Sequence, residues 1–281
     1  MSIGSNIVSV LRAIYRGTPW PCVRQFYFRL FCNLVRGRKI RASIDGLAFD
    51  LDLGETVDVS LFLQQYEVEV SAAIEKYGRA GMTALDIGAN IGAHTLRLAK
   101  KIGPTGTVHA FEPTDFAFEK MQRNLELNAI TNVVPHKLAL STNNLRSQRI
   151  QYRSSWPTNG LALEKESVVD FQRLDDVLKE LRTGKVSLIK LDVDGNEYSV
   201  LRGGEAMLRR DQPIILLEVW GPNFTFDETN PFVFLKTLGY RFFDLQTEVE
   251  LPSVESLRRR VSAGQELIDH SFNVVAKPHL P

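Results

Sequence analysis

A glycine-rich turn between an apolar run and a helical pattern most constrains how this chain can fold. Residues 84–100 read ALDIGANIGAHTLRLAK. Small and apolar residues lead to Asp86, glycines follow at positions 88 and 92, and apolar residues then recur at helical spacing. In open α/β sheets, ligands bind at such turns, outside the carboxyl ends of the strands. The stretch therefore predicts a nucleotide-type ligand site in an α/β domain.

Alternating strand and helix patterns follow this turn and extend the prediction to a whole domain. Several strand candidates are almost entirely apolar, as expected when helices cover both faces of a parallel sheet. The expected strands are 83–87, 107–111, 133–139, 186–192, 213–219, 240–245 and 271–276, the last two forming a pair at one edge. The expected helices are 91–101, 115–128, 196–209 and 231–238.

The first 56 residues follow a different pattern. Two short amphipathic helices are expected on either side of Pro19 and Pro21, and Asp45-Gly46 joins two alternating runs as a hairpin. Residues 1–44 hold eight Arg or Lys and no acid, which leaves 26 bases against 33 acids in the rest. We expect a basic extension over residues 1–56. The helices either cap the main domain or contact an acidic membrane surface or another polyanion.

The composition of the chain indicates in which compartment the protein acts and which classes of partner it binds. The net charge of +1 gives no overall field that would attract nucleic acid, so no nucleic-acid partner is expected. The chain has two cysteines, no signal-peptide cleavage pattern and no apolar run of about 20 residues. These features favour a cytoplasmic protein, peripheral to the membrane if the basic helices bind lipid.

The glycine turn does not match a dinucleotide-binding fingerprint. A fingerprint beginning at Gly88 requires further glycines at positions that hold Asn90 and Ala93. Asp86 would repel a pyrophosphate but suits a ligand that carries an ammonium group. S-adenosylmethionine meets this requirement, because it has an ammonium, a sulfonium and a ribose but no phosphate. Glu112, at the end of the next strand, is then expected to accept hydrogen bonds from the ribose hydroxyls.

Five ordered blocks extend these observations to a resemblance. LDIGANIGAHTLRLA is followed by VHAFEP, NLELNAITNVVPHKLALS, IKLDVDGNEYSVLRGG and PIILLEVW. Together they resemble the FkbM family of S-adenosylmethionine-dependent methyltransferases over residues 57–276. The resemblance implies a class I, Rossmann-like methyltransferase domain over residues 57–281. Its seven-stranded, mostly parallel sheet would carry helices on both faces. Methyl transfer to a hydroxyl of a sugar, glycan or secondary metabolite is also implied.

The resemblance also implies which residues contact the cofactor. These residues are Asp86, Gly88, Asn90, Gly92, Glu112, Pro113, Ala139 and Glu67. Ala139 would lie beside the adenine at the end of the third strand. Glu67, next to Tyr66, would reach the methionine end.

The stretch VSLIKLDVDGNE is expected to supply the catalytic groups. Lys190 and Asp192 share one face of an apolar strand, where charges without partners are costly. They either pair and end the strand, or face the methyl group. In the second case Asp192 or Asp194 is the base or the anchor of the substrate hydroxyl. Glu197 is either part of this site or an acid that stabilises the helix start.

Two further groups stand near the same edge. Glu218 ends the next strand and is predicted to join the catalytic set of Lys190, Asp192 and Asp194. Asp192 and Glu218 would be the ligands if a divalent cation such as Mg²⁺ takes part. His94 opens the helix after the turn and either acts as a base or packs.

The sequence thus favours an S-adenosylmethionine-dependent O-methyltransferase with a small-molecule or glycan acceptor. An N-methyltransferase, a non-catalytic methyltransferase-like binding protein and a dehydrogenase are the alternatives. Aromatic residues on two loops either stack on a sugar face or pack within the protein: Trp156, Trp220, Phe224 and Phe226.

Overall fold

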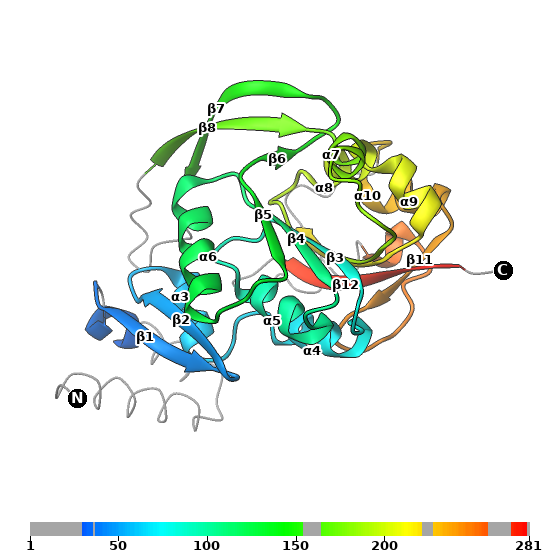
Figure 1. The fold of residues 1–281 in the computed structure, drawn as a ribbon. Helices are drawn as coiled ribbons and strands as arrows, with labels where there is room; N and C mark the ends of the chain where they lie inside the picture. The colour runs from blue at the N-terminus through cyan, green and yellow to red at the C-terminus, as the bar shows by residue number, and fades with distance from the viewer. Residues whose placement is uncertain (1–29, 36, 154–163, 221–226, 258–270, 280–281) are drawn as a thin grey trace. The chain divides into compact units, whose positions relative to one another are not determined.

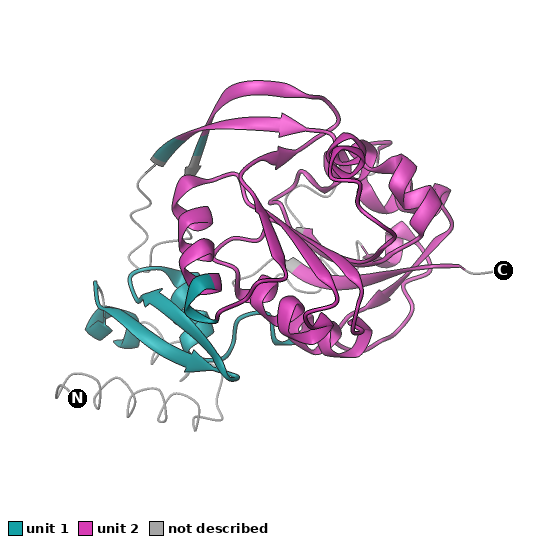
Figure 2. Ribbon diagram, viewed as in Figure 1, with its two compact units in different colours: residues 1–68, 126–128, 151–166 teal, residues 69–125, 129–150, 167–281 magenta. Residues whose placement is uncertain are grey.

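The computed structural model describes residues 30–35, 37–153, 164–220, 227–257 and 271–279 (Figure 1). The first predicted N-terminal helix and the predicted aromatic residues Trp156, Phe224 and Phe226 lie outside these ranges. The chain divides into two compact units (Figure 2). Unit 1 comprises residues 1–68, 126–128 and 151–166, and unit 2 comprises the remainder. The predicted boundary between residues 56 and 57 stays a prediction.

Unit 2 is built on a seven-stranded sheet in the order β11-β12-β10-β9-β3-β4-β5. Its strands are β3 (Thr83–Ile87), β4 (Thr107–Phe111), β5 (Val133–His136), β9 (Val186–Leu191), β10 (Ile214–Trp220), β11 (Tyr240–Asp244) and β12 (Ser271–Pro278). The five strands from β10 to β5 run parallel, and β12 runs antiparallel to both β10 and β11. The predicted seven-stranded, mostly parallel sheet is confirmed.

Helices cover both faces of this sheet, as predicted. On one face, α4 (Val68–Tyr77) and α5 (Ala93–Ile102) pack with Ala84, Val108 and Leu188. On the other face, Leu85 and Leu191 pack with α7 (Leu174–Glu180), α8 (Glu197–Gly203), α9 (Glu205–Asp211) and α10 (Pro231–Thr237). A further helix, α6 (Asp115–Leu127), connects β4 to β5. Ala84 and Leu85 thus pack on opposite faces of the sheet, as successive side chains of a strand do.

Two predicted elements are each divided into two in the structure, whereas the others differ from their predicted bounds by at most two residues at an end. The strand expected over 133–139 ends at His136, and Ala139–Leu140 forms a separate short strand, β6, which pairs with β8 (Glu164–Gln172). The helix expected over 196–209 is two helices, because Gly204 ends α8 and begins α9. A second sheet has the order β6-β8-β7, where β7 is Leu145–Arg153. The elements α3 (Thr56–Phe62), α4, α7, β7 and β8 were not predicted from the sequence.

Unit 1 contains the predicted hairpin, formed by β1 (Lys39–Ile44) and β2 (Leu47–Asp52). Asp45 and Gly46 turn with positive φ, as the Asp-Gly signal predicts. The following helix α3 (Thr56–Phe62) is tied to the hairpin by buried Asp58, whose Oδ1 accepts from the Asp52 N–H at 2.7 Å. Residues 30–35 are also helical, and the rings of Phe31 and Phe62 stack with centroids 6.1 Å apart.

Within the parts of the chain that the structure describes, no helix combines the length and the apolar character needed to cross a bilayer.

Candidate functional site

The glycine turn follows β3, at the carboxyl edge of the sheet. Gly88 has φ +79°, and a Cβ added to it would lie 1.7 Å from the carbonyl oxygen of Asp192. Gly92 has φ +85°, and its Cβ would meet the Met121 side chain at 2.9 Å. Both positions therefore require glycine, for conformation and for space. The turn after β3 is consequently packed against the end of β9.

Asp86 presents a buried acceptor oxygen at this turn. Its side chain is fully buried, and Oδ2 accepts a hydrogen bond from the Thr95 hydroxyl at 2.6 Å. Oδ1 is also buried and has no hydrogen-bond donor among the described residues. A buried acceptor without a partner costs about 1–3 kcal/mol, and more when it is charged. A ligand that carries a hydrogen-bond donor would satisfy this atom.

Asn90, in the glycine turn after β3, is joined to Glu112, which follows the adjacent strand β4. The backbone N–H of Asn90 donates to Glu112 Oε2 at 3.0 Å, and Glu112 Oε1 accepts from the N–H of Thr114 at 2.9 Å. Burial raises the pKa of Glu112, although these hydrogen bonds oppose the shift. The side-chain oxygen of Asn90 is buried without a donor among the described residues. The turn therefore offers a second acceptor oxygen for which the described residues supply no donor.

Lys190 connects the glycine turn to Asp192. Lys190 is the register partner of Asp86 on the adjacent strand. Its Nζ donates to Asp192 Oδ2 at 2.9 Å and to the Gly88 carbonyl at 3.2 Å. The exposed fractions of the two side chains are 5% for Lys190 and 19% for Asp192, so the pair is largely desolvated. The expected pairing of Lys190 with Asp192 is present, and it lies directly against the glycine turn.

The pairing with Lys190 stabilises the ionised form of Asp192. Burial alone would raise the pKa of Asp192, but the Lys190 charge and hydrogen bonds with Glu218 and Lys190 outweigh it and lower that pKa. His94 acts electrostatically on Asp192 in the same direction. His94 is 3% exposed and sits in the first turn of α5. The structure therefore brings His94 into the surroundings of Asp192.

Asp194 differs from Asp192 in its environment. It is exposed and adopts φ +52°, an uncommon conformation for a residue with a side chain. Although part of Asp194 faces solvent, neighbouring protein atoms displace water from its carboxylate, and this desolvation together with the nearby charge of Asp192 raises the pKa of Asp194. Carboxylate oxygens of Asp192, Asp194 and Glu218 all lie within 4.8 Å of one another. The predicted convergence of these three groups is present. A divalent cation there stays a prediction, and Lys190 already places a positive charge beside Asp192.

Glu197 stabilises the turn that carries Asp194. Its Oε1 accepts from the backbone N–H groups of Val193 at 3.2 Å and Gly195 at 3.1 Å. Burial raises the pKa of Glu197. Of its two expected roles, the geometry favours the structural one at the start of α8. The residues on both sides of Asp194 are thereby fixed.

The structure connects the three other predicted cofactor residues less directly with the glycine turn. Pro113 lies between Glu112 and Thr114, directly after β4. Ala139 is half-buried in β6, not at the end of a strand of the main sheet, because the chain leaves that sheet at His136. Glu67 belongs to unit 1, so its contact with the cofactor stays a prediction.

The structure also reveals a histidine pair that sequence spacing does not show. Nδ1 of His109 on β4 lies 3.1 Å from Nε2 of His136 on β5, and Phe111 stacks on His136 with ring centroids 4.6 Å apart. Burial lowers the pKa of both histidines, to about 4 for His136. The two residues are 27 positions apart and meet only because β4 and β5 are neighbours.

Comparisons with known proteins identify the family. The model of the Methyltransferase FkbM domain matches residues 86–242, which include all of the groups described above at the sheet edge. The chain belongs to this FkbM methyltransferase family. Its predicted identity as a methyltransferase of this family is confirmed.

Individual relatives are more distant. "Methyltransferase 1" of Beauveria bassiana is 35% identical over 142 residues, which cover 42% of this chain and 57% of that protein. The hexuronic acid methyltransferase AglP of Haloferax volcanii is 28% identical over 123 residues, covering 42% of this chain and 48% of that protein. The chain spans about half the length of these curated relatives.

Among solved structures, a methyltransferase FkbM from Methylobacillus flagellatus is 13% identical with a TM-score of 0.46. The match covers 91% of this chain and 59% of that one.

Proposed function

We propose that this FkbM-family chain uses S-adenosylmethionine to methylate a hydroxyl oxygen of a sugar-like or secondary-metabolite acceptor. The observation that carries the cofactor assignment is the buried Asp86 Oδ1, which lacks a donor among the described residues. The Asn90 side-chain oxygen repeats this arrangement on the same turn. A phosphate brings only acceptors and negative charge to such a turn. An amino-acid ammonium and ribose hydroxyls bring the donors that it lacks.

Each polar residue of the turn then has a distinct task in binding. Asp86 accepts from the ammonium of the cofactor's methionine moiety, with Asn90 as a neighbouring acceptor. Glu112 has spare lone pairs beyond its bonds to Asn90 and Thr114, and accepts from the ribose hydroxyls. When bound, S-adenosylmethionine supplies an electrophilic methyl group on a sulfonium. Gly88 and Gly92 keep the backbone free of side chains where the cofactor approaches.

The acceptor side is formed by the carboxylates after β9 and in β10. A neutral alcohol is a weak nucleophile, so a positioned base contributes about 10²- to 10⁴-fold to the rate. Asp192 and Asp194 are suited to orient the hydroxyl or receive its proton, with Glu218 beside them. Lys190 keeps Asp192 ionised and fixes it against Gly88. A cation held by Asp192 and Glu218 would serve the same purpose by lowering the pKa of the alcohol.

The proposed acceptor class has support from the named relatives. One of them is a hexuronic acid methyltransferase, at 28% identity. A sugar acid combines hydroxyl groups with a carboxylate, and both are oxygen acceptors. An oxygen acceptor also fits the carboxylate-rich edge, because a base there removes a proton from the reacting hydroxyl.

Calorimetric titration tests the cofactor assignment. S-adenosylhomocysteine, the demethylated product, is titrated into the full chain, with NAD as the control. We expect micromolar binding of the first and none of the second. Binding of NAD, or the absence of binding by S-adenosylhomocysteine, would contradict the assignment.

Transfer of labelled methyl groups tests the acceptor class. The protein is incubated with methyl-labelled S-adenosylmethionine and a panel of glucuronides, neutral glycosides and primary amines. We expect labelled product from an oxygen acceptor and none from the amines. Labelling of the amines alone would identify an N-methyltransferase instead.

A further inference from the structure

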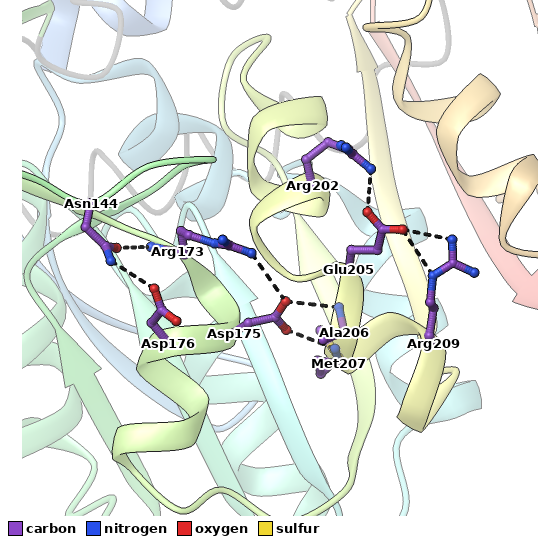
Figure 3. A network of polar contacts seen from close by, with 9 residues as sticks. All are labelled: Asn144, Arg173, Asp175, Asp176, Arg202, Glu205, Ala206, Met207 and Arg209. Carbon is purple, nitrogen blue, oxygen red and sulfur yellow. Dashed lines mark hydrogen bonds and ion pairs between the residues drawn. The ribbon is translucent and has the colours of Figure 1, made fainter.

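A cleft of about 440 Å³ lies in unit 2, apart from the residues of the proposed active site. It is bounded by the starts of α7 and α9 and by the end of α8. The cleft is lined by Arg173, Arg202 and Arg209 together with Asp175 and Glu205 (Figure 3), and by Thr142. None of the predicted cofactor or catalytic residues takes part in this lining. The cleft is therefore distinct from the proposed active site in the residues that line it.

The two carboxylates of the cleft are already engaged. Asp175 accepts from the backbone N–H groups of Ala206 at 3.0 Å and Met207 at 2.9 Å, so it caps α9 (Figure 3). Glu205 Oε1 accepts from Arg209 Nε at 3.0 Å and Nη2 at 2.8 Å, and its Oε2 pairs with Arg202. These carboxylates hold the helices and the arginines in place. They have little capacity left to bind a cation.

The arginines, in contrast, retain unused donors. A guanidinium has five N–H donors, and Arg202 gives one nitrogen to Glu205 while its plane lies over the Phe234 ring at 5.1 Å. The closest ion-pair contact of the Arg173 guanidinium among the described residues is Asp175 Oδ2 at 4.0 Å, which is beyond hydrogen-bond length. Three guanidinium groups against two carboxylates leave one positive charge. The lining is thus donor-rich and positive.

We propose that this cleft binds the phosphate group of a small phosphorylated molecule. A guanidinium group can donate two parallel hydrogen bonds to phosphate oxygens. The three terminal oxygens of a phosphate monoester can accept hydrogen bonds from three separate arginines. A carboxylate ligand has only two oxygens and can therefore accept hydrogen bonds from fewer of these arginines. The volume falls within the roughly 300–1,000 Å³ of small-molecule sites, so it holds a sugar phosphate rather than a lone ion.

Overall charge favours a small ligand over a nucleic-acid backbone. Residues 45–281 carry 26 basic and 33 acidic side chains, so the chain outside the basic N-terminus is negative. That field repels a long polyanion, whereas a single phosphate feels mainly the nearby arginines. The ligand class is therefore a phosphate monoester of sugar-like size.

Titration of the full chain with glucose 6-phosphate tests the proposal, with glucose and sodium chloride at matched ionic strength as controls. We expect saturable binding of glucose 6-phosphate and none of glucose. Arg173→Ala should weaken this binding about tenfold or more, because it removes charge-assisted hydrogen bonds to the phosphate and, within the protein, only the 4.0 Å ion-pair contact with Asp175. Arg202→Lys keeps the charge and loses the planar fork, so it should weaken binding to a smaller extent. Circular dichroism melting of each variant verifies that it is folded.

Two matched variants sharpen the test. Arg123→Ala removes an exposed arginine that pairs with Glu119 on α6, and should leave the affinity unchanged. Glu205→Gln removes the carboxylate that competes for Arg202 and Arg209, and should strengthen binding several-fold. The proposal fails if Arg173→Ala and Arg202→Lys bind like the wild type, or if Arg123→Ala weakens binding equally. Preferential binding of duplex DNA over glucose 6-phosphate would also overturn it.

These measurements of phosphate binding need neither the cofactor nor the methyl acceptor. A negative result would therefore refute the phosphate site without bearing on the proposed methyltransferase function.

Discussion

At the scale of single residues, Asp86 has the most informative environment in the site. One of its oxygens is held by Thr95, and the other is buried without a donor among the described residues. Asp86→Asn keeps the shape but replaces one acceptor oxygen by a donor and removes the charge. We expect the affinity for S-adenosylhomocysteine, measured by calorimetry, to fall about tenfold or more, because a charged hydrogen bond contributes about 1.5–3 kcal/mol.

Thr95→Val provides the matched control for Asp86. It removes the hydroxyl that binds Asp86 Oδ2 and leaves the carboxylate in place. We expect a smaller loss of affinity than in Asp86→Asn, since Oδ1 still faces the ligand. If both substitutions reduced affinity equally, Asp86 would act by holding α5 and not by contacting the cofactor.

The residues of the candidate site could be selected from sequence because turns and strand ends have strong local signals. Asp86, Gly88 and Glu112 stand at fixed distances from apolar strands, so their meeting at one sheet edge follows from parallel topology. The role of Lys190 in linking Asp192 to the Gly88 carbonyl could not be predicted. It depends on the path of a long side chain between two strands that are separated by about 100 residues.

At the scale of elements, the paired histidines of β4 and β5 predict a pH dependence of stability. The pKa of His136 is lowered to about 4 by burial and by His109, against an ordinary value of 6.5. Between these values the unfolded chain binds a proton that the folded chain excludes. Stability is therefore complete above about pH 6.5 and declines as the pH falls towards 4. Thermal melting from pH 7 to pH 4.5 should show this decline.

His136→Gln isolates this contribution from the titration of carboxylates. Glutamine keeps polar atoms near His109 but does not ionise. We expect the melting temperature of the variant to depend less steeply on pH than that of the wild type between pH 6.5 and 5. Parallel curves for the two proteins would mean that the pair does not control acid stability.

The junction of α8 and α9 gives a second prediction for an element. A Cβ at Gly203 would lie 2.2 Å from the Ser141 carbonyl oxygen, so α8 can approach this segment only with glycine there. We expect Gly203→Ala to lower the free energy of unfolding in urea by about 2 kcal/mol or more. Gly184→Ala is the control, because nothing lies within 4 Å of its added Cβ. Equal stability of the two variants would contradict the close packing.

How well elements could be predicted depended on how deeply they are buried. The strands over 83–87 and 107–111 were predicted with their observed ends, since apolar runs bounded by polar or glycine residues mark buried strands clearly. The strand β7 reads LRSQRIQYR, and its residues 145–149 are exposed, so it has no apolar alternation to detect. The break at Gly204 was missed because apolar spacing continues on both sides of it.

At the scale of the whole molecule, cofactor binding should stabilise one unit directly. All residues assigned to the cofactor except Glu67 belong to unit 2. A ligand at about 100 times its dissociation constant adds about 2.7 kcal/mol to the stability of the state that binds it. For a chain of this size we expect the melting temperature to rise by about 5 °C with S-adenosylhomocysteine and to stay constant with NAD.

Hydrogen exchange locates this stabilisation along the chain. Binding quenches local opening near the ligand, so amides in 86–92, 112–114 and 190–195 should exchange more slowly with S-adenosylhomocysteine present. The hairpin amides of 39–52, in unit 1, serve as the internal reference and should change little. Protection extending to 64–68 would support the predicted contact of Glu67 with the cofactor. Protection confined to 173–175 and 202–209, around the arginine-lined cleft, would instead place the cofactor away from the glycine turn and refute its assignment there.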